Sequence, residues 1–177
     1  MSQNILDRIV LRKQEEIILA KQQTSVKELE NSPAFGRTPY RFKDFLLADD
    51  RTGIIAEFKK QSPSKGVING NADVKEITQA YNTAGASALS VLTDTDFFGG
   101  KNEDLIQARS VNQIPILRKD FMIDEYQILE AKAWGADIIL LIASILSPQQ
   151  IVDLGKLAQS LGMNVLLEVH DLTELER

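Results

Sequence analysis

From residue 53 onward, short apolar runs alternate with longer stretches of mixed polarity. Five runs rich in Ile, Leu and Val are predicted to be strands, at 54–59, 88–93, 115–120, 137–142 and 165–170. Helices are predicted between them, at about 73–84, 102–111, 124–134 and 147–161. Strands of a parallel sheet are covered on both faces, so they read as nearly continuous apolar runs. The alternation therefore predicts an α/β fold in which right-handed crossovers join parallel strands.

Three of the predicted helices stop at a glycine, and a strand follows each glycine within three residues. These glycines are Gly85, Gly135 and Gly162. Glycine is typical of the left-handed position just past a helix end. The spacing fits both an open doubly wound sheet and a (β/α)8 barrel. The sequence contains neither a GxGxxG fingerprint nor a GxxxxGKS/T phosphate loop, which weakens the dinucleotide-binding and P-loop interpretations.

The N-terminal segment has a different pattern. Residues 4–22 place apolar side chains at near-helical spacing but interrupt them with charges of both signs, which predicts an amphipathic surface helix. This mixture excludes a signal-peptide core, and no apolar run reaches the ~20 residues that span a bilayer. A loop is predicted at 31–41 and a short helix from Phe42. We expect residues 1–48 to form a helical extension and residues 49–177 to form the βα units.

The amino-acid composition excludes several classes of functional site. The 177 residues include 25 acidic and 20 basic residues, a net charge of −5, so bulk attraction to nucleic acid or to an anionic membrane is not expected. There is no cysteine, which excludes disulfides, thiolate nucleophiles and cysteine-ligated metals. The single histidine, His170, excludes a His-rich metal site. Lysine and carboxylate side chains therefore become the candidates for catalysis.

Charged residues sit inside runs that are otherwise apolar. Glu57 and Lys59 are two apart in the first predicted strand, Lys119 ends the third, and Glu168 lies near the end of the fifth. Side chains two apart share a face, and inward-facing chemistry converges at the C-terminal ends of barrel strands. A single such residue is best explained as half of a structural ion pair, but four at the same end favour a catalytic site. Lysine can protonate a carbonyl, hold an anion or form a Schiff base, and glutamate can remove a proton.

The residues around these charges resemble the motifs of one enzyme family. Residues 57–66 (EFKKQSPSKG) are similar to the first-strand motif of indole-3-glycerol phosphate synthase, which has a glutamate, a lysine two residues later, then Ser-Pro-Ser and a glycine. Residues 115–121 (PILRKDF) resemble the third strand of that family, and residues 167–170 (LEVH) resemble the fifth. The resemblance runs in order from about Phe42 to the end, and the N-terminal helix resembles the extension that precedes the barrel in this family.

The resemblance implies an enzyme of tryptophan biosynthesis on a (β/α)8 TIM barrel that needs no cofactor. Its substrate is a small phosphosugar–anthranilate compound, 1-(2-carboxyphenylamino)-1-deoxyribulose 5-phosphate. The anthranilate carbon that bears the carboxylate attacks the ribulose carbonyl, and loss of CO2 and water gives indole-3-glycerol phosphate. Such an enzyme is a carbon–carbon lyase, and we expect it in the cytoplasm, without a nucleic-acid or membrane partner.

The resemblance also implies roles for individual residues, carried over by position. Lys119 is expected to be the general acid on the carbonyl and Glu168 the general base. Lys59 is expected to hold the anthranilate carboxylate and to share in proton transfer, while Glu57 orients the lysines and the reacting nitrogen. The other expected site residues are Ser62 and Ser64 near the carboxylate, and Phe98, Phe121 and Leu140 in an apolar slot around the aromatic ring.

The number of predicted strands is smaller than the number in the family's barrel. A (β/α)8 barrel has eight strands in typically about 250 residues, whereas these 177 residues supply five predicted strands. The family's sixth-strand Asn-x-Arg, seventh-strand glutamate and Gly-Ser phosphate elements are not found in the sequence. We therefore expect a truncated barrel with negligible synthase activity alone. Its open edges should cause self-association or loose packing, and should leave Ile55, Leu92, Leu117, Leu140 and Leu166 partly uncovered.

Two other functions stay open beside the synthase. One is another phosphosugar barrel enzyme, such as an isomerase or a Schiff-base aldolase, although the Glu57/Lys59 pair and the Ser-Pro-Ser loop argue against the aldolase. The other is a non-catalytic half-barrel that associates with itself. A lysine adduct trapped by borohydride would indicate the aldolase, and titration with indole-3-glycerol phosphate separates a synthase from a non-catalytic unit.

Overall fold

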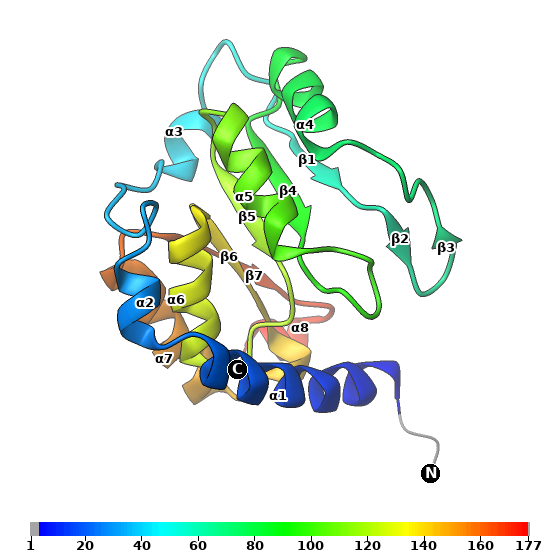
Figure 1. Cartoon of the computed structure of the whole chain (residues 1–177), viewed down its shortest axis with the longest axis vertical. Helices are drawn as coiled ribbons and strands as arrows, with labels where there is room; N and C mark the ends of the chain where they lie inside the picture. The colour runs from blue at the N-terminus through cyan, green and yellow to red at the C-terminus, as the bar shows by residue number, and fades with distance from the viewer. Residues whose placement is uncertain (1–3, 177) are drawn as a thin grey trace.

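The computed structural model describes residues 4–176, and its centre is a five-stranded sheet in the order β1-β4-β5-β6-β7. The strands are β1 (Ile55–Phe58), β4 (Ala88–Leu92), β5 (Ile116–Lys119), β6 (Ile138–Ile142) and β7 (Asn164–Glu168). Each neighbouring pair is parallel, as in a (β/α) barrel that has not closed (Figure 1). The five strands predicted from the apolar runs are therefore confirmed, and so is the partial-barrel architecture.

Helices connect the strands and cover one face of the sheet. They are α4 (Val74–Thr83), α5 (Asn102–Val111), α6 (Glu125–Trp134) and α7 (Pro148–Ser160). Their apolar side chains pack on the outward-facing strand residues, which include Leu89, Val91, Ile116, Ile139 and Leu141. Gly85, Gly135 and Gly162 adopt φ values of 90°, 90° and 78°, so the predicted left-handed positions after the helices are confirmed.

The N-terminal segment contains α1 (Ile5–Gln23), α2 (Val26–Glu30) and α3 (Phe42–Leu46). Helix α1 runs across the end of the sheet toward which the strands point (Figure 1). The sequence did not predict α2, nor the antiparallel hairpin of β2 (Gln61–Ser62) and β3 (Gly66–Val67) that follows β1. The remaining short elements are η1 (Ala143–Ile145) and α8 (Leu172–Leu175). No helix within residues 4–176 is both long enough and apolar enough to cross a membrane.

The inner face of the sheet corrects one expectation. Leu92, Leu117 and Leu140 were expected to be partly uncovered, but they are 4%, 2% and 1% exposed. Inner-face side chains from neighbouring strands pack together, and Phe42, Phe121 and Ile145 pack against this second core. Only the two edge-strand residues of that set, Ile55 and Leu166, are partly exposed, as predicted.

The chain turns back sharply after β4, and Gly100 allows this close approach. Its N–H donates a hydrogen bond to the carbonyl oxygen of Asp94 at 2.7 Å. A Cβ at Gly100 would overlap the backbone carbonyl of Leu92. The backbone therefore requires glycine here, and the tight turn sets the position of the preceding residues 97–99 at the C-terminal end of the sheet.

We predict that Gly100→Ala lowers the free energy of unfolding by about 1–3 kcal/mol, because the added methyl group displaces backbone that cannot move freely. Gly155→Ala is the matched control. Gly155 lies inside α7, and a Cβ there meets nothing within 4 Å. The control should be neutral or up to about 1 kcal/mol more stable. Urea denaturation measures both variants, and equal losses would contradict the explanation.

Candidate active site

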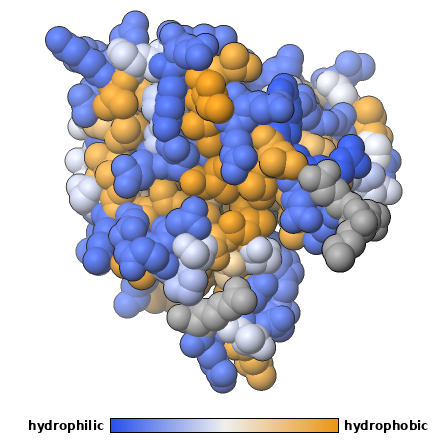
Figure 2. Space-filling model, turned by 90° about the horizontal axis from the view of Figure 1, so that it is seen from below, coloured by the Kyte–Doolittle hydropathy of each residue, from blue (hydrophilic) through white to orange (hydrophobic). Residues whose placement is uncertain are grey.

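A pocket of about 560 Å³ opens at the C-terminal ends of the strands. Figure 2 views this end of the molecule, where apolar side chains gather at the centre and hydrophilic ones surround them. The structure brings all nine predicted site residues into the lining of this one pocket: Glu57, Lys59, Ser62, Ser64, Phe98, Lys119, Phe121, Leu140 and Glu168. Helix α1 closes one side of the pocket with Ile5, Leu6 and Ile9.

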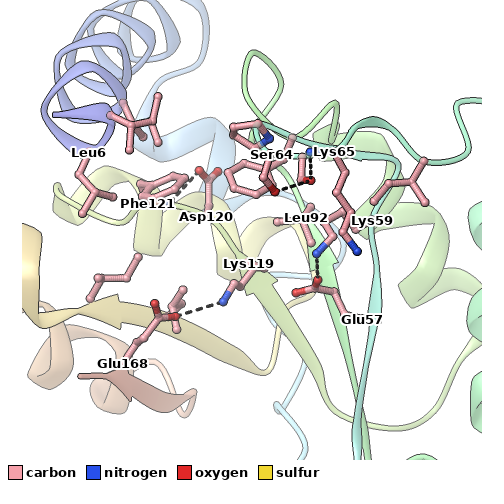
Figure 3. Close-up of a pocket in the computed structure, with 18 of the residues that line it drawn as sticks. Leu6, Glu57, Lys59, Ser64, Lys65, Leu92, Lys119, Asp120, Phe121 and Glu168 are labelled. Atoms are coloured by element: carbon pink, nitrogen blue, oxygen red, sulfur yellow. Dashed lines mark hydrogen bonds and ion pairs between the residues drawn. The ribbon is translucent and has the colours of Figure 1, made fainter. Parts of the chain in front are cut away.

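Two lysine–glutamate pairs face the pocket (Figure 3). Lys59 Nζ lies 2.7 Å from Glu57 Oε1 at the end of β1. Lys119 Nζ, from β5, lies 3.2 Å from Glu168 Oε2, from β7. The four side chains are between 31% and 35% exposed, so the pairs are open to the pocket and are not sealed in the core. Both lysines are therefore held in place while they stay accessible to a ligand.

The position of Lys119 follows from its neighbour on β5. Arg118 points to the opposite face, where it is 3% exposed. It pairs with Glu130 at 3.2 Å and Asp120 at 3.0 Å, and its guanidinium lies 4.2 Å from the centre of the Trp134 ring. Because strand side chains alternate between faces, an Arg118 fixed outside directs Lys119 into the pocket.

An apolar slot lies beside the charged pairs. The rings of Phe98 and Phe121 are 6.0 Å apart between centroids and tilted by 39°. Leu92, Leu140 and Ile142 line the same pocket from β4 and β6. A flat apolar group such as an aromatic ring fits these walls, since aromatic pairs favour tilted or offset contacts at such distances.

The Ser-Pro-Ser sequence runs from the end of β2 into the turn of the β2–β3 hairpin. The hydroxyls of Ser62 and Ser64 are 3.5 Å apart, and the N–H of Lys65 donates to Ser62 Oγ at 3.3 Å. Both serines line the pocket, and Figure 3 shows Ser64 on the far side of the pocket from the Lys119–Glu168 pair. The hairpin therefore presents a polar rim to a ligand in the slot.

The sequence did not predict a second group of charges, which joins α1 to the strand ends. Lys13 is only 3% exposed. Its Nζ lies 2.6 Å from Glu16 Oε2, 3.1 Å from Asp94 Oδ2 and 3.0 Å from Asp120 Oδ1. The one available signal was spacing, because Lys13 lies midway between Ile9 and Ile17 on the buried face of α1.

Mutual attraction keeps these buried groups ionised. Burial alone would lower the pKa of Lys13, but the charges of Asp120 and Asp94 outweigh it, and the pKa is raised. Burial alone would raise the pKa of Asp120, but Lys13 and Arg118 hold that pKa at about 2. Asp120 follows directly after Lys119, so the ion pair ties the active-site end of β5 to helix α1.

We predict that Lys13→Met lowers the free energy of unfolding by roughly 3–5 kcal/mol, because it leaves the buried Asp94 and Asp120 carboxylates without this cation. Arg12→Met is the control on the same helix. Arg12 pairs with Asp96 at 2.6 Å, but its side chain is 38% exposed and solvent screens the pair, so the loss should be much smaller than for Lys13→Met. Urea denaturation followed by far-UV circular dichroism compares the two, and similar losses would count against a buried ionic anchor.

Comparison with known proteins agrees with this geometry. A sequence model of the family described as "Indole-3-glycerol phosphate synthase" matches residues 6–177. Curated proteins of that name include one from Bordetella pertussis, 46% identical over 176 residues, which cover 98% of this chain and 67% of the relative. Another, from Bacteroides thetaiotaomicron, is 46% identical over 175 residues, 97% of this chain and 66% of the relative. The chain thus spans about two thirds of these relatives' length, and it belongs to the indole-3-glycerol phosphate synthase family.

Proposed function

We propose that this chain carries the acid–base part of an indole-3-glycerol phosphate synthase active site. The substrate would be 1-(2-carboxyphenylamino)-1-deoxyribulose 5-phosphate, and the reaction would close the indole ring with loss of CO2 and water. The observation that carries the proposal is the convergence of the nine predicted residues on one pocket. The substrate is a phosphorylated metabolite of amino-acid biosynthesis, and we propose the cytoplasm as its place of conversion.

Lys119 is proposed as the general acid. Attack on the ribulose carbonyl develops negative charge on the carbonyl oxygen, and an ammonium group nearby can stabilise that charge and then protonate it. Lys119 is suited to this because it projects from β5 into the pocket and pairs with Glu168 at 3.2 Å. Glu168 is proposed as the base that removes a proton during the loss of water, since its carboxylate faces the same space.

Lys59 and Glu57 are proposed to act on the anthranilate end. Lys59 would bind the substrate carboxylate, with the Ser62 and Ser64 hydroxyls close to that group. Glu57 holds the Lys59 ammonium at 2.7 Å and would orient it before the substrate arrives. This orientation matters because ring closure interrupts aromaticity, and correct alignment of ring and carbonyl can supply several kcal/mol of the barrier.

The apolar slot is proposed to hold the aromatic ring between Phe98, Phe121 and Leu140. Exclusion of water there would strengthen the electrostatic effect of the lysines. It would also remove hydration from the carboxylate and so favour its loss as neutral CO2. The walls of the pocket would thus favour both the ring closure and the loss of CO2.

We predict that Lys119→Ala lowers kcat by about 100-fold or more and changes KM far less, because the general acid acts in the transition state. The assay uses a completed enzyme, in which this chain is continued by the last third of the Bordetella pertussis relative. Lys156→Ala, an exposed lysine on the outer helix α7, is the control and should keep the parent kcat. A change in KM alone would make Lys119 a binding residue and place the acid elsewhere.

The 177-residue chain by itself is predicted to have negligible synthase activity. Barrel enzymes commonly bind substrate phosphate with the loops after the seventh and eighth strands, and the sheet described here has five. The chain therefore supplies the proposed acid and base but not that phosphate site. Product formation is followed by indole fluorescence on a purified sample of verified sequence. Robust turnover by that sample would overturn the prediction.

We also predict that the 177-residue chain associates with itself. Within the described residues, β1 and β7 each pair with a single strand, and Ile54 and Leu167 beside these edges are 59% and 42% exposed. Open strand edges of this kind readily pair with further strands. Sedimentation velocity should show species larger than a monomer, with a fraction that rises with concentration. A stable, compact monomer at all concentrations would contradict this.

A further inference from the structure

His170, the single histidine of the sequence, has no role in the reaction proposed above. It follows β7, two residues after Glu168, and lines the same pocket. Its Nε2 lies 3.3 Å from Glu168 Oε1, and its Nδ1 lies 3.5 Å from Glu174 Oε2. The side chain is 56% exposed, so one imidazole contacts both solvent and the proposed base.

The Glu168 carboxylate therefore connects two different groups. Its Oε2 faces Lys119 Nζ at 3.2 Å inside the pocket, and its Oε1 faces the His170 ring at the rim. Glu174 Oε2 accepts a hydrogen bond from the backbone N–H of His170 at 2.8 Å and lies 3.5 Å from Nδ1 of the ring. Glu174 belongs to α8, so this short helix holds the imidazole beside the base.

The proton balance of the proposed reaction requires a supply route. The ribulose carbonyl oxygen takes up two protons and leaves as water, while the substrate gives up one C–H proton to the base. The carboxylate departs as CO2 and leaves its bonding electron pair on the ring. Each turnover thus consumes one proton more than the substrate gives back, and that proton must come from solvent to the general acid.

We propose that His170 relays this proton from solvent through Glu168 to Lys119, an inference that rests on the proposed function. The imidazolium gives a proton to Glu168 Oε1, the carboxyl group turns by half a rotation, and the same proton passes to the neutral Lys119 amine. Glu168 returns to its carboxylate form, and water or buffer acid recharges His170. Imidazole is suited to this step because it exchanges protons near neutral pH.

A direct supply of water to Lys119 is the competing route. The Lys119 side chain is 31% exposed. An aromatic ring in the slot of Phe98, Phe121 and Leu140 would cover that face, whereas His170 stays at the rim. The route through Glu168 is then the one that remains open during turnover.

The contact between His170 and Glu168 can be tested on this chain itself. Because His170 is its only histidine, two-bond ¹H–¹⁵N spectra show one imidazole ring. We expect Glu168→Gln to change both ring-nitrogen shifts, since it removes the charged partner of Nε2. Leu172→Ala, which truncates a side chain 74% exposed on α8, should leave the shifts unchanged. Identical spectra for the parent chain and Glu168→Gln would overturn the proposal.

The relay can be tested on the completed enzyme. His170→Ala should lower kcat by about tenfold or more with little change in KM, and added imidazole should restore much of the loss. Leu172→Ala should keep the parent kcat and show no response to imidazole. An unchanged kcat in His170→Ala, or a loss that imidazole does not restore, would overturn the relay.

Two further measurements separate a failed relay from a variant that does not fold and from a failure of the proposed function. If His170→Ala does not fold, His170→Gln keeps a polar side chain that transfers no proton, and the same fall in kcat is expected; parent-like kcat would overturn the relay. If the completed parent enzyme makes no indole-3-glycerol phosphate, the proposed function fails, and with it the relay that rests on it. A failure of the relay alone would leave parent turnover intact.

Discussion

The two-residue period of β5 is the constraint on which the site depends. Arg118, Lys119 and Asp120 are consecutive charges, yet the alternation of strand side chains separates Lys119 from the other two, which pair with each other. Arg118 is buried among Glu130, Asp120 and the Trp134 ring on the helix side. Lys119 is left partly exposed on the pocket side. A shift of one residue in strand pairing would exchange the faces of the two cations. Arg118 would then face the pocket, and Lys119 would be buried on the helix side.

Helix α1 belongs to the site as much as the strands do. Its buried face carries Lys13 between Ile9 and Ile17, and Lys13 contacts the carboxylate that follows Lys119. The first turns of the same helix supply an apolar wall of the pocket. One element thus contacts the end of β5 and forms a wall of the pocket, so the docking of α1 is coupled to the geometry of the candidate acid.

The sequence predicted the strands because each is a short, mostly apolar run, and three of them follow a helix that ends in glycine. It also indicated Glu57, Lys59, Lys119 and Glu168, because charged residues near the ends of otherwise apolar runs stand out. The family resemblance supplied the other five site positions. It did not predict the contacts of Lys13, because its partners lie far along the chain and a lysine on an amphipathic helix normally faces solvent. The burial of Leu117 was also missed, because Leu117 packs with inner-face residues of neighbouring strands in a cluster that side chains of α3 and of the loop after β5 also cover.

The two lysine–glutamate pairs explain how a site can be ordered and still exchange partners. Partly exposed ion pairs contribute little to stability, typically below about 1 kcal/mol, because solvent screens them and ordering the side chains costs entropy. In the proposed reaction, Lys59 would therefore leave Glu57 for the substrate carboxylate at small cost, and Lys119 would turn from Glu168 to the developing oxyanion. The buried pairs of Lys13 and Arg118 cannot exchange in this way, because separation would strand charges away from water. The depth of each ion pair thus separates the charges that hold the site in place from those that are free to react.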